Sequence, residues 1–438
     1  MRHAFPRKTD TMDLLDLVTF PTRPLRALCR VPADLGSVTR RGVEVPSQEL
    51  GISQARVEEV WDRVQKLYRT GLYPGIQICI RREGRVVLHR AIGHARGNAP
   101  GQDSADNATL LDVTTPFTLF SASKAITAML IHKLDEQRVL RLDDRVCDYV
   151  PEFAAHGKAE ITLRHILAHR SGIPHVPPEI MDLDLLADSE NVLAAVCEAR
   201  PTSKAGRRLA YHAISGGFVL RAVVERVTGL DLRVVLDREI RRPLGMRWFS
   251  YGVGAEDVSQ VAENAFTGFP PVPPVSMLLE RALGMELREA VALSNDPRFF
   301  DEAIPSANVV TTALELSRFY QCLLDGGKWE AERVFEARTV QRATAEQSFM
   351  ELDFTLGLPI RYGLGFMLGA KNLSLYGSDT PEAFGHVGLT NIFSWADPER
   401  QIAVAILTSG KPFISLDVLR VFQVESAIGR SFPKLVAA

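Results

Sequence analysis

The sequence predicts an α/β fold in which a sheet assembled from both ends of the chain is interrupted by a mainly helical insertion. Apolar runs bounded by turn residues predict strands near the two ends, at 76–80, 85–92, 384–395 and 401–407. Between about 116 and 300 the apolar residues follow helical spacing or give way to loops. Since the strands lie at the ends and the helices between them, we expect one sheet closed around a helical insertion.

The length of the chain indicates more than one structural unit. Its 438 residues exceed a single typical core, so two structural domains are expected. We expect an irregular N-terminal extension over 1–50, a discontinuous sheet domain over 51–115 and 301–438, and a mainly helical domain over 116–300. Four prolines interrupt the extension, and its purpose is open.

Local signals define the remaining elements. Ser53 is placed to cap a helix through Leu67, and Arg82-Glu83-Gly84 suits the tight turn of a hairpin. Glycines predict the ends of several later helices. These helices are expected at 161–169, 215–228 and 311–324, with a closing helix at 416–428.

Composition excludes several classes of function. Hydrophobic residues make up 46% and charged residues 24%, and 51 basic against 53 acidic residues give a net charge of −2. No basic face for nucleic acid is indicated, and no apolar run approaches the ~18 residues of a membrane span. The five cysteines are scattered without metal-site spacing, and no signal peptide is evident. We expect a cytoplasmic protein without a metal or another cofactor.

Ser121 and Lys124 are the most informative residues of the chain. At positions i and i+3 of an expected helix, the hydroxyl and the amine lie on one face and can meet. Burial disfavours a charged lysine, and a neutral amine beside a serine is a base beside a nucleophile. The pair predicts a serine hydrolase without a Ser-His-Asp triad. A second Ser-x-x-Lys, Ser431 to Lys434, contains Pro433 and is interpreted as a chance match.

Two further segments could complete such a site. Tyr211 could relay a proton if neighbouring cations lowered its pKa. In the expected strand around His386, Gly385 and Gly388 would allow a substrate close to the backbone. An N–H at that strand edge and the N–H of Ser121 could bind an oxyanion.

Several motifs together resemble the serine β-lactamase and penicillin-binding-protein superfamily, in its class C-like branch. Within that branch the chain is most similar to family VIII carboxylesterases and related bacterial esterases. The resemblance spans roughly 50–430, and the motifs occur in the family's order. They are Ser121-Ala-Ser-Lys124, Ile166-Leu-Ala-His169-Arg-Ser171-Gly172, Tyr211-His-Ala, Pro305-Ser-Ala-Asn308 and Gly385-His386-Val-Gly388.

The resemblance implies a β-lactamase-like fold and a role for each matched residue. The fold would be an antiparallel sheet flanked by N- and C-terminal helices. Ser121 would be acylated, Lys124 would be its base, and Tyr211 would shuttle the proton. His386 and Gly388 would border the substrate, and the N–H groups of Ser121 and Leu389 would form the oxyanion hole.

Two departures from the lactamase pattern favour a simple ester. Ala213 stands where many lactamases have the asparagine of Tyr-x-Asn, which removes an amide able to contact a β-lactam. The late Lys-Thr-Gly tripeptide is absent, and His386 is a weaker anchor for a carboxylate than lysine. We expect hydrolysis of short-chain acyl esters, a small-molecule substrate whose pocket walls lie within 181–200 and 265–300.

Other interpretations remain open with less support. A β-lactamase or D-Ala-D-Ala carboxypeptidase fits the fold, and a non-catalytic binding protein on the same fold is a third alternative. The Gly-x-Ser-x-Gly elbow of α/β hydrolases does not occur. His165 and His169 have helical spacing for zinc but lack the acidic partner of metalloproteases. Oligomeric state is not legible from the sequence.

Overall fold

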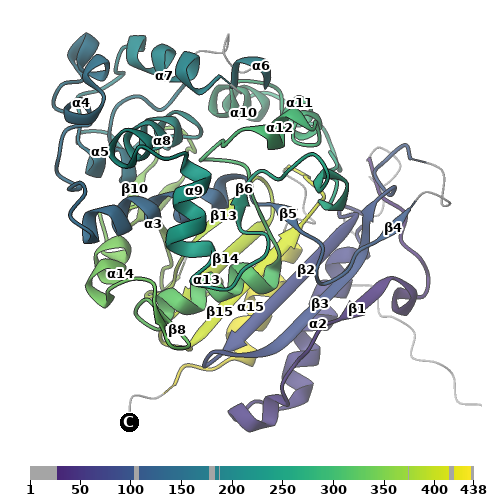
Figure 1. Cartoon of the computed structure of the whole chain (residues 1–438). Helices are drawn as coiled ribbons and strands as arrows, with labels where there is room; N and C mark the ends of the chain where they lie inside the picture. The colour runs from purple at the N-terminus through teal and green to yellow at the C-terminus, as the bar shows by residue number, and fades with distance from the viewer. Residues whose placement is uncertain are drawn as a thin grey trace, which may run out of the picture.

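The computed structural model describes residues 27–102, 108–176, 183–186, 188–372, 374–413 and 419–435. Its centre is a ten-stranded sheet with the strand order β1-β3-β2-β15-β14-β13-β12-β11-β10, and β4 pairs with β3 (Figure 1). All of these pairings are antiparallel, as the sheet of the expected fold requires. The strands are β1 Thr39–Arg41, β2 Gly75–Arg82, β3 Arg85–Arg96, β4 Thr109–Leu110, β10 Ser348–Leu352, β11 Pro359–Tyr362, β12 Met367–Leu368, β13 Phe384–Gly388, β14 Ile392–Asp397 and β15 Ile402–Thr408.

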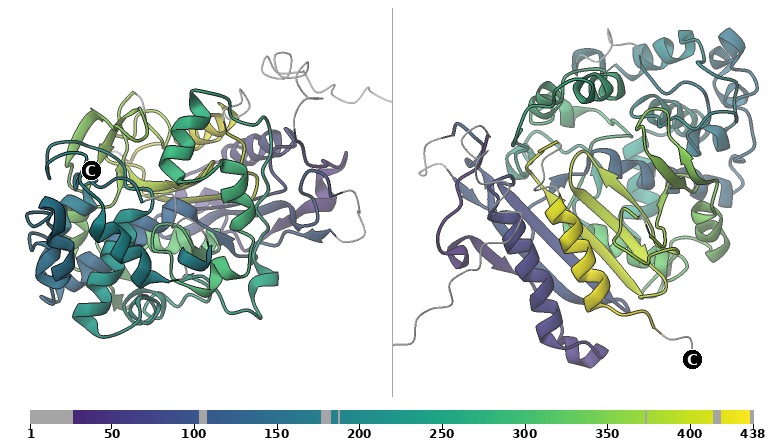
Figure 2. Two further views of the ribbon diagram at one scale, coloured as in Figure 1. Left: turned by 90° about the horizontal axis from the view of Figure 1, so that it is seen from above. Right: turned by 180° about the vertical axis from the view of Figure 1, so that it is seen from behind.

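The middle of the sheet is covered on both faces. Every residue of β2, β14 and β15 is buried, so these strands are continuous apolar runs without the alternation of a half-exposed strand. On one face, α2 (Gln54–Tyr68) and α15 (Leu419–Ser431) lie side by side, as the view from behind shows (Figure 2). On the other face, α13 (Ala313–Leu324) packs against β2, β14 and β15.

A mainly helical region lies beyond the α13 face of the sheet (Figure 1). It shares one large apolar cluster with the sheet, whereas α2 and α15 share a second cluster on the opposite face. The region and its connections contain α3 Ser123–Glu136, α4 Val146–Tyr149, α5 Leu163–Leu167, α6 Leu183–Leu186, α7 Ser189–Glu198, α8 Ser215–Thr228, α9 Leu232–Leu236, α10 Val275–Leu283, α11 Leu287–Leu293, α12 Arg298–Asp301 and α14 Ala337–Thr344, with the short strands β5 Phe117–Thr118, β6 Ser250–Tyr251, β7 Val309–Thr311, β8 Lys328–Trp329 and β9 Glu332–Arg333.

Strong local signals predicted their elements well. Helix α8 spans the expected residues and ends at Gly229, whose φ of 66° places it in the left-handed region. The hairpin between β2 and β3 turns at Glu83 and Gly84, both with positive φ. No helix among the described residues is long and apolar enough to cross a membrane.

Three expectations require correction. The single strand expected over 384–395 is two strands, because the chain reverses at Thr390 and Asn391, which have φ values of 33° and 70°. The helix expected over 161–169 is confined to α5. The later part of the expected extension is not separate, since β1 pairs with β3 at the edge of the sheet. The expected closing helix begins at 416, and its first residues lie outside the described chain.

Candidate active site

Ser121 lies in a tight turn that joins the small sheet to α3. Strand β5 ends at Thr118, a 3₁₀ turn covers Phe120–Ala122, and α3 starts at Ser123. Phe120 has a φ of 48°, which for a bulky residue costs on the order of 1–3 kcal/mol and persists only where the surroundings impose it. The strained residue therefore directly precedes the serine.

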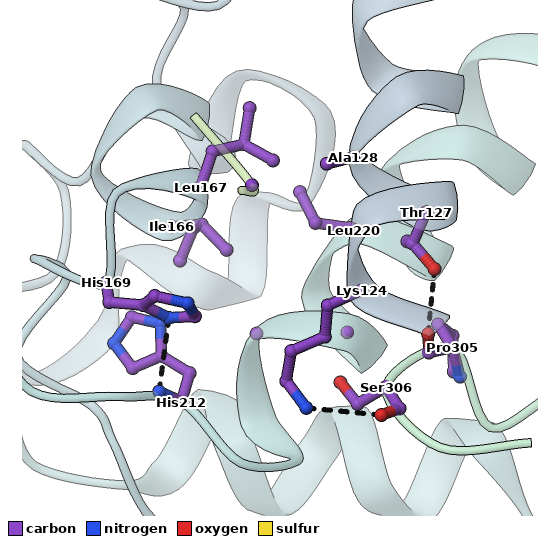
Figure 3. A pocket seen from close by; sticks show the side chains of 13 residues that line it. Lys124, Thr127, Ala128, Ile166, Leu167, His169, His212, Leu220, Pro305 and Ser306 are labelled. Atoms are coloured by element: carbon purple, nitrogen blue, oxygen red, sulfur yellow. Dashed lines mark hydrogen bonds between the residues drawn. The ribbon is translucent and has the colours of Figure 1, made fainter. Parts of the chain in front are cut away.

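Lys124 reaches back from the first turn of α3 to Ser121. Its Nζ lies 3.1 Å from Ser121 Oγ and donates to the Ser306 carbonyl oxygen, also at 3.1 Å. Figure 3 shows the amine directed at Ser306, in a cavity that is also lined by Ile166 and Leu220. Burial among these groups holds the pKa of Lys124 well below its ordinary value. The fold thus places a buried amine, whose pKa is depressed, in contact with the serine, as the sequence predicts.

Tyr211 completes this cluster from the segment before α8. Its phenol is hydrogen-bonded to Ser121, and its ring centroid lies 4.9 Å from Lys124 Nζ. The expected lowering of the tyrosine pKa is wrong, because burial raises the pKa of Tyr211 and outweighs its bond to Ser121. Tyr211 is therefore a phenol at neutral pH.

His386 lies near Tyr211 on β13 without carrying a charge. The two ring centroids are 6.3 Å apart, and His386 Nδ1 lies 2.8 Å from the Val387 carbonyl oxygen. Burial and the neighbouring Lys124 lower the pKa of His386 to about 3. The ring is neutral at pH 7 and offers no positive charge to a substrate carboxylate.

A glycine is required at position 388 because another backbone segment passes close to it. A Cβ at this position would lie 2.2 Å from the carbonyl oxygen of Leu119, two residues before Ser121. At Gly385 the carbonyl oxygen of Ser394 on β14 would lie 2.1 Å from an added Cβ. The glycines therefore allow chain segments to approach each other, whereas the sequence interpretation assigned that space to a substrate.

An apolar pocket of about 90 Å³ opens at Ser121. Leu389, the residue after β13, also lines it, so both residues expected to form the oxyanion hole border one pocket. None of the described residues that line it is charged. Segment 265–300 contributes Leu283, Met285, Ala290, Leu293 and Phe299, as expected, whereas Leu183 is the only described contribution from 181–200.

The second Ser-x-x-Lys behaves as a chance match. Ser431 Oγ donates to the Arg56 carbonyl oxygen at 3.0 Å, and Lys434 Nζ forms ion pairs with Asp379 and Glu399. The Ser431 hydroxyl and the Lys434 amine are therefore each bound to other groups. The spacing alone therefore does not create a reactive pair.

The histidines considered for zinc have other contacts. His165 Nδ1 lies 3.1 Å from the Thr162 backbone nitrogen at the start of α5, and the ring of His169 packs on Tyr211 at 4.7 Å. Within the described ranges no group of three or more candidate ligands could hold a metal ion. Sequence reasoning missed two contributions to the site. The Ser306 carbonyl lies within the quoted motif Pro305-Ser-Ala-Asn308, but no role was assigned to it. The Asp353 carboxylate, which accepts the Tyr211 N–H, lies outside every motif.

Comparisons with known proteins agree with this fold. A family model described as Beta-lactamase matches residues 60–426. The chain is 29% identical to the esterase/beta-lactamase LipL of Mycobacterium tuberculosis over 69% of this chain and 70% of the relative. The structure of a penicillin-binding protein homologue from Caulobacter crescentus superposes with a TM-score of 0.73 at 26% identity, covering 86% and 97% of the two chains. A family VIII carboxylesterase has the same TM-score at 24% identity, covering 88% and 98%, and shows the shared fold.

The fold, the serine site and these relatives define a hydrolase of the serine class. The match over most of its length shows that the chain belongs to the beta-lactamase family. The esterases among its relatives agree with the predicted resemblance.

Proposed function

We propose that the protein is a serine carboxylesterase that hydrolyses esters with short acyl chains through an acyl-enzyme on Ser121. The observation that carries this proposal is the 3.1 Å contact between Ser121 Oγ and the buried amine of Lys124, at the mouth of an uncharged pocket. A serine in contact with a neutral amine is an activated nucleophile.

The reaction follows from the protonation states. Lys124 accepts the Ser121 proton while Oγ attacks the ester carbonyl carbon, and the N–H groups of Ser121 and Leu389 stabilise the oxyanion. The phenol of Tyr211 gives its proton to the departing alkoxide and regains one from Lys124. Water then attacks the acyl-enzyme, its proton passes to the same pair, and Ser121 leaves as the alcohol.

The lining of the pocket supports an ester over a β-lactam. A β-lactam carries a carboxylate, whereas the part of this pocket's lining that the structure describes is uncharged and His386 is neutral. Ala213, which lines the pocket, also offers no side-chain amide. β-Lactam hydrolysis is the second candidate, because LipL, the relative at 29% identity, is named both esterase and beta-lactamase.

A matched pair of variants tests the proposal. Wild-type protein is expected to hydrolyse p-nitrophenyl butyrate, and Ser121→Ala is expected to reduce kcat by at least ~10³-fold. Ser431→Ala, in the second Ser-x-x-Lys, should retain wild-type kcat. Equal activity of wild type and Ser121→Ala would refute the mechanism. Turnover of a chromogenic cephalosporin in preference to the ester would establish the second candidate.

Tyr211→Phe is expected to separate proton transfer from binding. Because the phenol contacts Ser121 and is proposed to give its proton to the leaving group, its removal should lower kcat about 10²- to 10⁴-fold with a smaller change in KM. Steady-state kinetics on p-nitrophenyl butyrate measure both constants. A raised KM with unchanged kcat would instead make Tyr211 a binding residue.

A further inference from the structure

A buried carboxylate outside every motif of the sequence contacts the backbone of Tyr211. Asp353 follows β10, and its Oδ1 accepts the N–H of Tyr211 at 3.1 Å, of Thr355 at 2.8 Å and of Leu356 at 3.0 Å. Its Oδ2 accepts the hydroxyl of Tyr362 at 3.2 Å. The side chain is fully buried, and none of the ion pairs in the described part of the chain involves it. Neutral donors thus satisfy this carboxylate.

The same segment is held from the other side by His169. His169 Nδ1 accepts the N–H of His212 at 3.2 Å, and its carbonyl oxygen accepts the N–H of Ala210 at 3.0 Å. Its ring packs against the rings of Tyr211 at 4.7 Å and Tyr362 at 5.0 Å. Tyr362 therefore contacts both Asp353 and His169.

Along four consecutive residues, 209–212, the backbone hydrogen bonds go alternately to the segment of Asp353 and to His169. The carbonyl of Leu209 accepts the N–H of Phe354 at 3.0 Å, Ala210 donates to His169, Tyr211 donates to Asp353, and His212 donates to His169. A peptide fixed at each successive residue leaves the Tyr211 side chain few orientations. The phenol is thereby presented to Ser121 before any substrate binds.

We propose that Asp353 is a positioning residue that orients the phenol of Tyr211 toward Ser121 by holding the Tyr211 backbone. The inference rests on the proposed esterase function and extends it to a residue that touches neither substrate nor nucleophile. A misplacement of a reacting group by 1 Å costs about 10²-fold in rate, so the loss of this anchor has a large kinetic effect.

The charge of Asp353 has a second effect on the same phenol. Burial is the main cause of the raised pKa of Tyr211, and the nearby negative charge of Asp353 adds to it. A proton on Tyr211 is the form that can be given to a leaving alkoxide. The Asp353 carboxylate thus both orients the Tyr211 phenol and favours its protonated form.

A double-mutant cycle tests the proposal with p-nitrophenyl butyrate. Asp353→Ala is expected to lower kcat about 10- to 100-fold with little change in KM. In the Tyr211→Phe background the same change should alter kcat by less than about 3-fold, because no phenol remains to be oriented. Asp353→Asn, which keeps an acceptor oxygen for the Tyr211 N–H, should restore most of the loss.

Asp397→Ala is the matched control. Asp397 is another fully buried carboxylate, at the end of β14 and far from Tyr211 in the sequence. It accepts the N–H groups of Glu399 at 3.0 Å and Arg400 at 3.2 Å and, unlike Asp353, also forms an ion pair with the Arg400 guanidinium at 2.8 Å. Its loss should lower the melting temperature and leave kcat unchanged. If Asp353→Ala does not fold, Tyr362→Phe replaces it in the same double-mutant cycle. This variant removes only the hydroxyl that donates to Asp353 Oδ2, and we expect kcat to fall about 3- to 10-fold.

The outcomes separate two failures. An active wild type whose kcat is unaffected by Asp353→Ala, or is lowered equally in both backgrounds, would overturn the positioning role alone. A wild type without esterase activity would overturn the proposed function and this inference with it. Loss of kcat confined to the background that contains Tyr211 would establish the role.

Discussion

Lys124→Met is expected to abolish ester hydrolysis and at the same time to make the protein more stable. The side chains have similar length, but methionine has no amine to accept the Ser121 proton, so kcat should fall by at least ~10³-fold. Burial beside Ile166 and Leu220 removes hydration from the lysine amine, which costs free energy, whereas the apolar methionine side chain has no such cost. Activity is measured with p-nitrophenyl butyrate and stability by the melting temperature.

The direction of the stability change follows from the depressed pKa. The unfolded lysine binds a proton below about pH 10.4, whereas the folded Lys124 binds one only below its much lower pKa. Between these values the unfolded chain holds more protons, so the wild type loses stability as pH falls through this window. The advantage of Lys124→Met should therefore be larger at pH 7 than at pH 9.

Lys133→Met provides the comparison on the same helix. Lys133 donates at 2.7 Å to Glu136 and to the Val334 carbonyl oxygen, away from Ser121. This variant should keep wild-type kcat and show no gain in melting temperature. A Lys124→Met protein that melts below the wild type at pH 7, or that retains activity, would contradict the assignment of a neutral buried base.

The second large effect is expected for Gly388→Ala. The new Cβ would lie 2.2 Å from the Leu119 carbonyl oxygen, so β13 and the segment leading into Ser121 must move apart. That motion should destabilise the fold by about 1–3 kcal/mol, as overpacking does. Because Leu389 follows directly, the separation of the proposed oxyanion donors also changes, and kcat should fall about 10²- to 10³-fold.

A glycine with free space around it is the control for this substitution. Gly429 lies in α15, and the nearest atoms to an added Cβ are 4.0 Å away. Gly429→Ala should leave kcat unchanged and stabilise the protein by about 0.4–1 kcal/mol. Thermal melts and kinetics of both variants decide the question. Wild-type kinetics of Gly388→Ala would show that the close approach does not set the oxyanion geometry.

Sequence reasoning succeeded where the determining signal is local. The spacing between Ser121, in the 3₁₀ turn, and Lys124, in the first turn of α3, depends on residues a few positions apart, as does the glycine after α8. The buried run 384–395 carried no such signal for its turn, because strands covered on both faces lack alternation. The pKa direction of Tyr211 was also inaccessible, since it depends on burial by distant segments.

Asp353 illustrates the same limit most clearly. It stands 142 positions from Tyr211 in the sequence, and its neighbours form no recognisable pattern. Only the folded hairpin of β10 and β11 brings its carboxylate to the tyrosine backbone. Residues that touch the reacting groups belonged to family motifs, whereas the residue that orients them did not.

The pairing of β2 with β15 has a consequence for biosynthesis. These strands are adjacent in the middle of the sheet, and next to their last pair the Gly75 N–H donates to the hydroxyl of Ser409, 334 positions away in the sequence. During synthesis β2 and β3 emerge from the ribosome long before β15. Their apolar residues stay exposed until β15 can pair with β2. Contacts of such large sequence separation form slowly. Completion of the sheet, and with it the placement of β13 beside Ser121, is therefore a late event in folding, and the incomplete sheet needs protection from aggregation until β15 pairs.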